Sequence, residues 1–349
     1  MVSPPDQPRT AAHVLELIGG TPAIWLDRLG VGLPGRVLLK LETQNPGGSI
    51  KDRAALRCLE DAIARGDLQP GGTVVELTSG NMGIGLAIAC AVLGYQMVAV
   101  MSEGNSAERR RVLAAYGAEV ILVPQAPGGI AGQVSGDDLA LVEQRTEEVV
   151  RERGAWRPDQ FRNPSNIAAH AATTGPELWA QATTSGDPLW AFTAMVGTAG
   201  TFVGIARALK SRDSAIKCFA AEPAGAPVLA GRPLTNPSHK LQGAGYAMIP
   251  SGWDPTLADG FLAITDEQAL TAARDLARQE GILGGFTTGA NVAAAMHLAA
   301  QAPDREQLPR SRPTPDFATS ARICSTARNE RLLSDPPAAA PLTSLSWNH

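Results

Sequence analysis

Short apolar runs alternate with stretches of helical periodicity through most of the chain. The strand-length runs cover residues 37–41, 73–77, 97–101, 120–123, 189–196 and 217–221. The helical stretches begin near residues 49 and 289 and otherwise cover residues 84–93, 107–116, 201–210 and 266–279. Strands that alternate with helices of this length favour right-handed βαβ units and parallel sheets. The pattern therefore predicts an α/β protein with enough strands for two sheets.

The C-terminal part of the chain breaks this pattern. From residue 302 onward Pro and Arg are frequent, and neither a period of 2 nor one of 3.6 emerges. Prolines at this density interrupt most long helices. Residues 303–349 are therefore predicted to form an atypical tail that is mostly loop or disordered.

Composition excludes several classes of function. The 349 residues, 44% hydrophobic and 18% charged, suit a globular protein of about two domains. The net charge of −4 gives no general attraction to nucleic acid. No apolar run is long enough for a membrane span, and the first residues lack the layout of a signal peptide. We therefore expect a cytoplasmic protein with no nucleic-acid or membrane partner.

The cysteines and histidines point to neither a disulfide framework nor a metal site. Cys58, Cys90, Cys218 and Cys324 are widely scattered, and no C-x-x-C spacing occurs. The five histidines lie far from them along the sequence. We expect separate reduced thiols and no metal.

One glycine-rich turn places a lysine where its chemistry would be altered. Residues 45–53 (NPGGSIKDR) lead from a strand into a helix whose first turn carries Lys51. The positive end of a helix disfavours an ammonium group, and a lysine with a lowered pKa is what a Schiff base requires. The alternative is an ordinary solvated lysine at a helix start.

Three further glycine-rich turns also join a strand to a helix. Residues 78–83 (TSGNMG) offer backbone N–H groups and hydroxyls to a carboxylate, although a simple N-cap is the alternative. Residues 197–201 (GTAGT) suit a phosphate but form neither a P-loop nor a dinucleotide fingerprint. Residues 284–290 (GGFTTGA) are a weaker signal of the same kind.

The glycine-rich turns and the neighbouring motifs are commonplace singly, but their order along the chain is specific to one protein family. The region from residue 15 to about 300 resembles the cysteine synthase / cystathionine β-synthase family of fold type II pyridoxal-5′-phosphate (PLP) enzymes. The resembling segments are residues 16–22 (ELIGGTP), 45–53, 78–81, 160–164 (QFRNP), 173–177 (TTGPE), 197–201, 222–223 and 242–245 (QGAG). The resemblance implies a tryptophan synthase β-like fold of two α/β domains, with the cofactor in the cleft between them.

The resemblance also implies a role for each candidate residue. Lys51 would hold PLP as a Schiff base and later move the substrate α-proton, and Asn81 would hydrogen-bond the ring hydroxyl of PLP. The cofactor phosphate would be bound by Gly197, Thr198, Ala199, Gly200 and Thr201. The substrate carboxylate would be bound by Thr78, Ser79, Gly80, Met82 and Gln160.

The same resemblance implies a domain organisation and partners. Residues 1–46 and 157–302 would form the larger PLP-binding domain. Residues 47–156 would form a smaller mobile domain that closes over the substrate. A homodimer is expected, and a serine acetyltransferase is a candidate partner.

Three functions are compatible with these features. The leading one is β-replacement on an activated serine such as O-acetylserine, with sulfide or another small nucleophile as acceptor. The second is β-elimination and deamination, or synthesis of a non-protein amino acid, on the same fold. The third is a weakly active or inactive homologue with a damaged C-terminus.

The chain departs from the family pattern at three places. Met82 stands where cysteine synthases usually have Thr, and Ala199 replaces a Gly of the phosphate turn. The family's final strand is expected to be absent, which would leave one sheet edge unpaired. Residues 325–334 only echo the segment whose Ser faces the pyridine nitrogen, so Ser325 and Thr326 are weak candidates for that contact.

Overall fold

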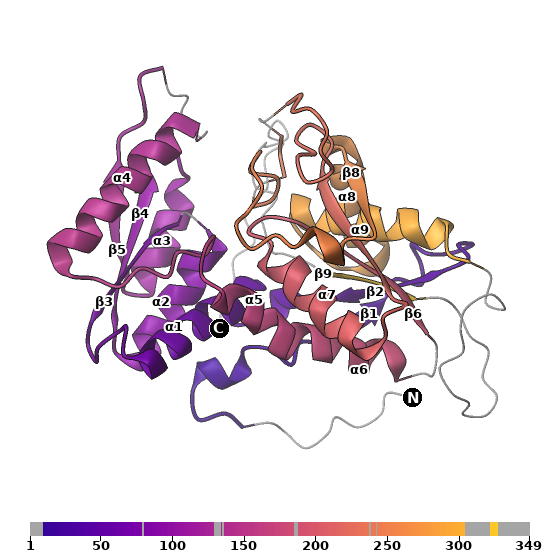
Figure 1. The fold of residues 1–349 in the computed structure, drawn as a ribbon, viewed down its shortest axis with the longest axis horizontal. Coiled ribbons are helices and arrows are strands. Elements are labelled where there is room, and N and C mark those ends of the chain that lie inside the picture. The colour runs from indigo at the N-terminus through magenta and orange to yellow at the C-terminus, as the bar shows by residue number, and fades with distance from the viewer. Residues whose placement is uncertain are drawn as a thin grey trace, which may run out of the picture.

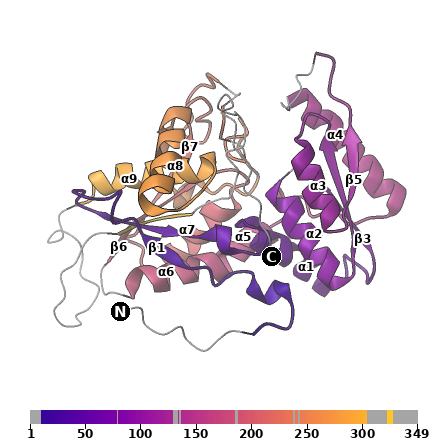
Figure 2. The same cartoon turned by 180° about the vertical axis from the view of Figure 1, so that it is seen from behind.

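The computed structural model describes residues 10–78, 80–128, 134, 136–184, 188–236, 239–241 and 243–303, together with the backbone of Arg322–Thr326. Two lobes built on separate sheets stand side by side (Figures 1 and 2). We call them the large lobe, which holds the six-stranded sheet, and the small lobe, which holds the three-stranded sheet.

The sheet of the large lobe is parallel apart from one edge strand. Its order is β1 (Ala23–Trp25), β2 (Arg36–Lys40), β9 (Arg322–Thr326), β6 (Leu189–Met195), β7 (Lys217–Pro223) and β8 (Gly260–Ile264), and only β1 runs antiparallel to its neighbour. Strand β2 explains why these strands appear as continuous apolar runs. Leu38 packs in one hydrophobic cluster, whereas Val37 and Leu39 pack in another on the opposite face. The sheet is therefore buried on both faces, as parallel sheets usually are.

Helices cover both faces of this sheet. They are α5 (Ser165–Ala169), a π-helical segment (His170–Thr174), α6 (Gly175–Thr183), α7 (Gly200–Arg212), α8 (Asp266–Glu280) and α9 (Phe286–Ala300). Apolar residues of α6 and α7 share a cluster with Leu38 and Phe192. Apolar residues of α8 and α9 share the cluster of Val37 and Leu39. This is a layered α/β arrangement, as the alternating pattern predicts.

The small lobe repeats the plan with three parallel strands. The order is β3 (Thr73–Leu77), β4 (Gln96–Ser102) and β5 (Glu119–Val123), and the helices are α1 (Lys51–Arg65), α2 (Asn81–Leu93), α3 (Ala107–Ala115) and α4 (Gly136–Arg153). Helices α1 and α2 pack on one face with Val74 and Met97, and α4 packs on the other with Val75 and Val98. Helices α1 and α2 both end at a glycine with positive φ, Gly66 and Gly94, a common helix C-cap.

Strand β9 corrects the expectation that the final strand is absent. It is present and does not lie at an edge but between β2 and β6, parallel to both, so the strand edges that face it are paired. The sequence signal was weak because only Ile323 and Cys324 are apolar within five residues. The other residues of the predicted tail beyond residue 303 lie outside the described part of the chain. The main ground for a damaged C-terminus, a missing strand, therefore falls away.

Among the residues that the structure describes, no helix has both the length and the apolar character that a bilayer span requires. Cys58, Cys90 and Cys218 are buried free thiols.

Candidate active site

Lys51 lies at the boundary between the two lobes. It is the first residue of α1, and its side chain is buried rather than solvated. Its Nζ donates a hydrogen bond of 3.3 Å to Oγ1 of Thr198, which follows β6 of the large lobe. The structure thus rules out the alternative of a solvated lysine and brings two of the four glycine-rich turns together.

The turn after β6 has no room for side chains at its glycines. A Cβ atom on Gly197 would lie 2.3 Å from the carbonyl oxygen of Gly243, and one on Gly200 would lie 2.2 Å from Oδ1 of Asn166. Helix α7 begins at Gly200, so its N-terminal N–H groups and partial positive charge point into this turn. With the hydroxyls of Thr198 and Thr201, the donors present fit a phosphate group.

Ala199 stands in this turn with a backbone that favours glycine. Its φ is +67°, in the left-handed region, and it forms the N-cap of α7. A non-glycine residue there costs roughly 1–2 kcal/mol. The turn keeps its left-handed step although the usual glycine is missing.

Asn166 links this turn to Gln160, the residue expected to contact the substrate. Its Nδ2 donates to Oγ1 of Thr198 at 2.9 Å and to the carbonyl oxygen of Gln160 at 2.8 Å. Gln160 and Thr198 both line a cavity of about 220 Å³. Among the residues that the structure describes, the lining is Gln160, Phe161, Arg162, Asn163, Pro164, Asn166, Ile167, Thr198, Ser251 and Gly252. Two separately predicted segments therefore border one cavity.

The turn after β3 uses one of its candidate hydroxyls as a cap. Oγ1 of Thr78 accepts the backbone N–H of Gly83 at 2.9 Å and that of Gly80 at 3.4 Å. A hydroxyl that accepts two bonds still has one hydrogen to donate, so capping does not exclude contact with a carboxylate. Asn81 is the first residue of α2, while Ser79 lies outside the described residues.

Met82 belongs to the apolar interior of the small lobe. Its side chain is 2% exposed and packs in the cluster formed by α1, α2 and β3. This packing gives the methionine a structural reason to be there. Its part in binding the substrate stays a prediction.

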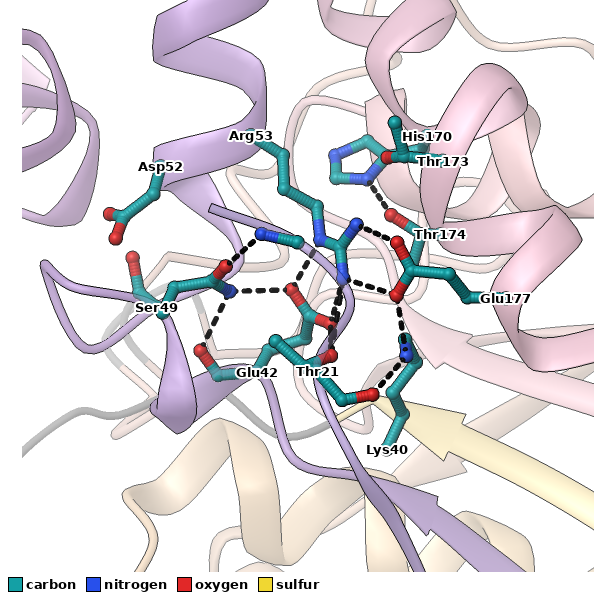
Figure 3. Close-up of polar contacts among 12 residues, drawn as sticks. Thr21, Lys40, Glu42, Ser49, Asp52, Arg53, His170, Thr173, Thr174 and Glu177 are labelled. Atoms are coloured by element: carbon teal, nitrogen blue, oxygen red, sulfur yellow. Dashed lines mark hydrogen bonds and ion pairs between the residues drawn. The ribbon is translucent and has the colours of Figure 1, made fainter. Parts of the chain in front are cut away.

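A buried ion network joins the start of α1 to the large lobe (Figure 3). The Arg53 guanidinium donates to both carboxylate oxygens of Glu42, at 2.8 and 2.9 Å, and to both of Glu177, at 2.6 and 2.7 Å. Lys40 Nζ reaches Glu177 at 2.8 Å, and Thr21 Oγ1 donates to Glu42 at 2.6 Å. Two cations thus face two carboxylates, and the forked geometry is the strong form of this contact.

The network shifts the pKa of Glu177 and that of Arg53 away from their ordinary values. Burial alone would raise the pKa of Glu177, but its hydrogen bond to Arg53, the charge of Arg53 and Lys40 lower it to about 2. Burial alone would lower the pKa of Arg53, but Glu177 and Glu42 raise it. Arg53 and Glu177 are therefore both charged at neutral pH, as their paired geometry requires.

Two other buried carboxyl groups flank the candidate site. Asp52 follows Lys51 and accepts the N–H of Gly47, while burial raises its pKa to about 7. Glu76, in β3 just before Thr78, is also buried, and burial raises its pKa to about 8. These shifts place both titrations close to neutral pH.

Sequence reasoning found the motifs that contain Arg53 and Glu177 but missed what these residues do. It also missed His170, which is fully buried in the π-helical segment. One ring nitrogen of His170 lies 2.9 Å from Oγ1 of Thr174, and the other lies 3.4 Å from Oγ1 of Thr201 in the turn after β6. A π-helical turn at this place is the signal that only the structure provides.

Comparisons with known proteins agree with this geometry. The family model described as "Pyridoxal-phosphate dependent enzyme" matches residues 14–308. A cysteine synthase of Staphylococcus aureus (strain Mu50 / ATCC 700699) is 41% identical over 288 residues, which is 82% of this chain and 88% of that protein.

Two solved structures share the fold over nearly the whole chain. The crystal structure of O-ureido-L-serine synthase has a TM-score of 0.79 and 33% identity, and the match covers 92% of each chain. A hydrogen sulfide-producing enzyme from Fusobacterium nucleatum has a TM-score of 0.80 and 33% identity, and the match covers 93% of this chain and 97% of that one. The likeness thus extends through both lobes.

Proposed function

The chain belongs to the pyridoxal-phosphate dependent enzymes, and from this premise we propose that it catalyses β-replacement on an activated serine. The donor is an O-acetylserine-like amino acid, and the acceptor is sulfide or another small nucleophile. The observation that carries the proposal is the contact between buried Lys51 and Thr198 of the phosphate turn. The names of the relatives, cysteine synthase and O-ureido-L-serine synthase, favour the same reaction type.

Residues of both lobes would hold the cofactor. Lys51 would form the covalent link, the turn of residues 197–201 would bind the phosphate, and Asn81 would contact the ring hydroxyl. When bound, PLP supplies an electron sink that weakens the bonds at the substrate Cα atom. Ser325 and Thr326 fall at the carboxyl end of β9, the sheet edge at which the β6 turn also lies. This position supports keeping them as candidates for the pyridine nitrogen.

The remaining steps are assigned to the chain's own side chains. Lys51 Nζ is proposed to take the proton from the substrate Cα atom, a role that suits an amine kept out of bulk water. The turn of residues 78–82 and Gln160 are proposed to bind the substrate carboxylate. Lys51 and Thr78 are buried, which strengthens their polar contacts because it lowers the local dielectric.

We propose that residues 47–156 act as a mobile domain that closes over the substrate. The small lobe has its own sheet and its own apolar clusters, which supports movement as a unit. The proposal also extends to a cytoplasmic homodimer and to a serine acetyltransferase partner, both of which rest on the family resemblance. Light scattering of the purified chain, alone and mixed with that enzyme, tests both assemblies.

A second candidate function is β-elimination, and one neighbour favours it. The Fusobacterium nucleatum protein is described as hydrogen sulfide-producing, which is the direction opposite to sulfide consumption. The buried Met82 at the start of α2 would suit a substrate different from that of cysteine synthases.

Titration of the PLP-loaded enzyme distinguishes these functions. Serine, O-acetylserine and O-phosphoserine are each added while the visible cofactor band is followed, and sulfide and amino-acid products are then measured. Consumption of sulfide with O-acetylserine is the expected result. Release of sulfide from cysteine, without any replacement activity, would support elimination instead.

A further inference from the structure

Arg53 lies two residues after Lys51 in the same helical turn. An α-helix turns by about 100° per residue, so the two side chains leave α1 roughly 200° apart, on nearly opposite sides. Lys51 contacts Thr198, while Arg53 enters the ion network with Glu42 and Glu177. A rotation or shift of α1 that moved one of these side chains would therefore move the other.

The network anchors Arg53 from three separate parts of the large lobe. Glu42 follows β2, Glu177 lies in α6, and Thr21 precedes β1 and accepts from Arg53 at 3.1 Å. Lys40 holds Glu177 in turn and donates to the carbonyl oxygen of Thr21 at 2.8 Å. Arg53 and Glu42 have side chains that are only 2% and 0% exposed. A shift of α1 against the large lobe would therefore break these bonds, so closure of the proposed mobile domain has to leave this end of α1 in place.

The network also gives a role to residues of the family-like segments that the proposed function does not use. Thr21 belongs to residues 16–22, Arg53 to residues 45–53 and Glu177 to residues 173–177, three of the segments that resemble the family. None of the three residues lines the cavity beside Gln160. Their polar atoms contact one another instead (Figure 3).

We infer that Arg53 is a positioning residue for Lys51: its two forked ion pairs fix α1 on the large lobe so that Lys51 Nζ faces the phosphate turn. The inference rests on the proposed function of Lys51. It adds that contacts outside the cavity beside Gln160 determine the position of the Lys51 amine. Arg suits this task because its planar guanidinium can fork to two carboxylates at once, which a lysine ammonium cannot do.

Two variants separate positioning from simple support of the fold. Arg53→Lys keeps the positive charge and loses the forks. The double variant Arg53→Met/Glu177→Gln removes one cation and one anion, so Lys40 and Glu42 remain as a balanced pair. The matched control is Arg65→Met, at the far end of the same helix, where Arg65 pairs with exposed Asp67 at 2.8 Å.

The first readout does not depend on turnover. Each variant is freed of cofactor and titrated with PLP, and the adduct is then reduced with borohydride and located by peptide mass mapping. We expect labelling of Lys51 to be slower and weaker in both network variants and unchanged in Arg65→Met. Thermal melting of each variant is measured in parallel, so that the labelling is compared between folded proteins.

The second readout compares the effect of each variant on kcat with its effect on KM. A misplaced amine should lower kcat by about 100-fold, the effect of an error near 1 Å in a catalytic group, and should leave KM for the amino acid nearly unchanged. Wild-type labelling and kcat in the folded double variant would overturn the inference, even if Arg53→Lys failed to fold. Absence of PLP on Lys51 of the wild-type protein would instead overturn the proposed function itself.

Discussion

The Nζ atom of Lys51 lies 3.3 Å from Oγ1 of Thr198, although 147 residues separate them along the chain. The contact joins the first turn of the small lobe's leading helix to the turn after β6 of the large lobe. The amine proposed to hold the cofactor and the turn proposed to bind its phosphate therefore meet where the two lobes face each other.

Removal of the Lys51 amine should abolish covalent binding of PLP and all turnover. We expect Lys51→Ala to lose the visible cofactor band, because the buried position next to Thr198 is then without an amine. Absorbance and product formation are measured together. Lys217→Ala is the control, since Lys217 is half exposed and pairs with Asp259 on the surface. A Lys51→Ala protein that kept both the band and the activity would disprove the assignment.

A methyl group at Gly197 should distort the phosphate turn. Its Cβ atom would lie 2.3 Å from the backbone carbonyl oxygen of Gly243, which cannot rotate away as a side chain could. We expect Gly197→Ala to destabilise the fold by about 1–3 kcal/mol and to weaken PLP affinity. Urea unfolding and PLP titration measure the two effects. Gly136→Ala, where a Cβ atom meets nothing within 4 Å, should change neither.

Met82→Thr should have opposite effects on stability and on substrate affinity. Loss of a buried methionine leaves a cavity in the apolar cluster, so the free energy of unfolding should fall by about 2 kcal/mol or more. If the new hydroxyl reaches the substrate carboxylate, KM for O-acetylserine should fall about 2- to 13-fold, the value of one neutral hydrogen bond. A loss of stability with unchanged KM would show that residue 82 serves the core alone.

Acid should unfold the protein partly through Glu177. The folded-state pKa of about 2 lies below the ordinary value of 4.5, so this carboxylate stabilises the fold above pH 4.5 and loses its effect as the pH falls toward 2. The difference between the two pKa values corresponds to at most about 3 kcal/mol of stability, and solvent around this partly exposed carboxylate reduces it. Glu177→Gln should therefore be much less stable than wild type at pH 7, and the two should converge near pH 2.

A surface pair provides the control for this pH dependence. Glu119 also has a lowered pKa, through its hydrogen bonds to Arg153, but its side chain is half exposed and screened by solvent. Glu119→Gln should change stability far less at every pH. Unfolding curves in urea at several pH values give both comparisons, and an equal effect of the two substitutions would contradict the buried-network interpretation.

Truncation of the chain tests the position of β9. A chain that ends at Gln301 leaves β2 and β6 without the parallel strand that hydrogen-bonds to both. We expect this chain to lose cooperative unfolding and PLP affinity, whereas a chain that ends at Thr326 keeps the strand and should retain more of both. Equal melting temperatures and PLP affinities for full-length protein and the chain ending at Gln301 would show that β9 contributes nothing.

Local pattern determined the fold class and the order of most elements. Runs such as residues 73–77 and 97–101 are apolar because their strands are buried on both faces, and a buried strand can be recognised without knowledge of its neighbours. The glycine-rich turns were also recognisable from the sequence, because a backbone that must approach a neighbouring group closely favours glycine. The small strands β1 and β8 and the helices α4 to α6 gave weaker patterns and were not predicted.

Tertiary structure alone decided which distant segments of the chain contact one another. The sequence indicates that Lys51 begins a helix, but only the packing of two lobes brings its Nζ to Thr198. It indicates that Arg53 and Glu177 are charged, but charge usually means exposure, and burial follows only when a partner from another element compensates the lost hydration. The position of β9 likewise depends on partners from other elements, here through backbone hydrogen bonds. Its five residues carry little apolar signal, and its place between β2 and β6 is fixed by hydrogen bonds to segments more than a hundred residues away.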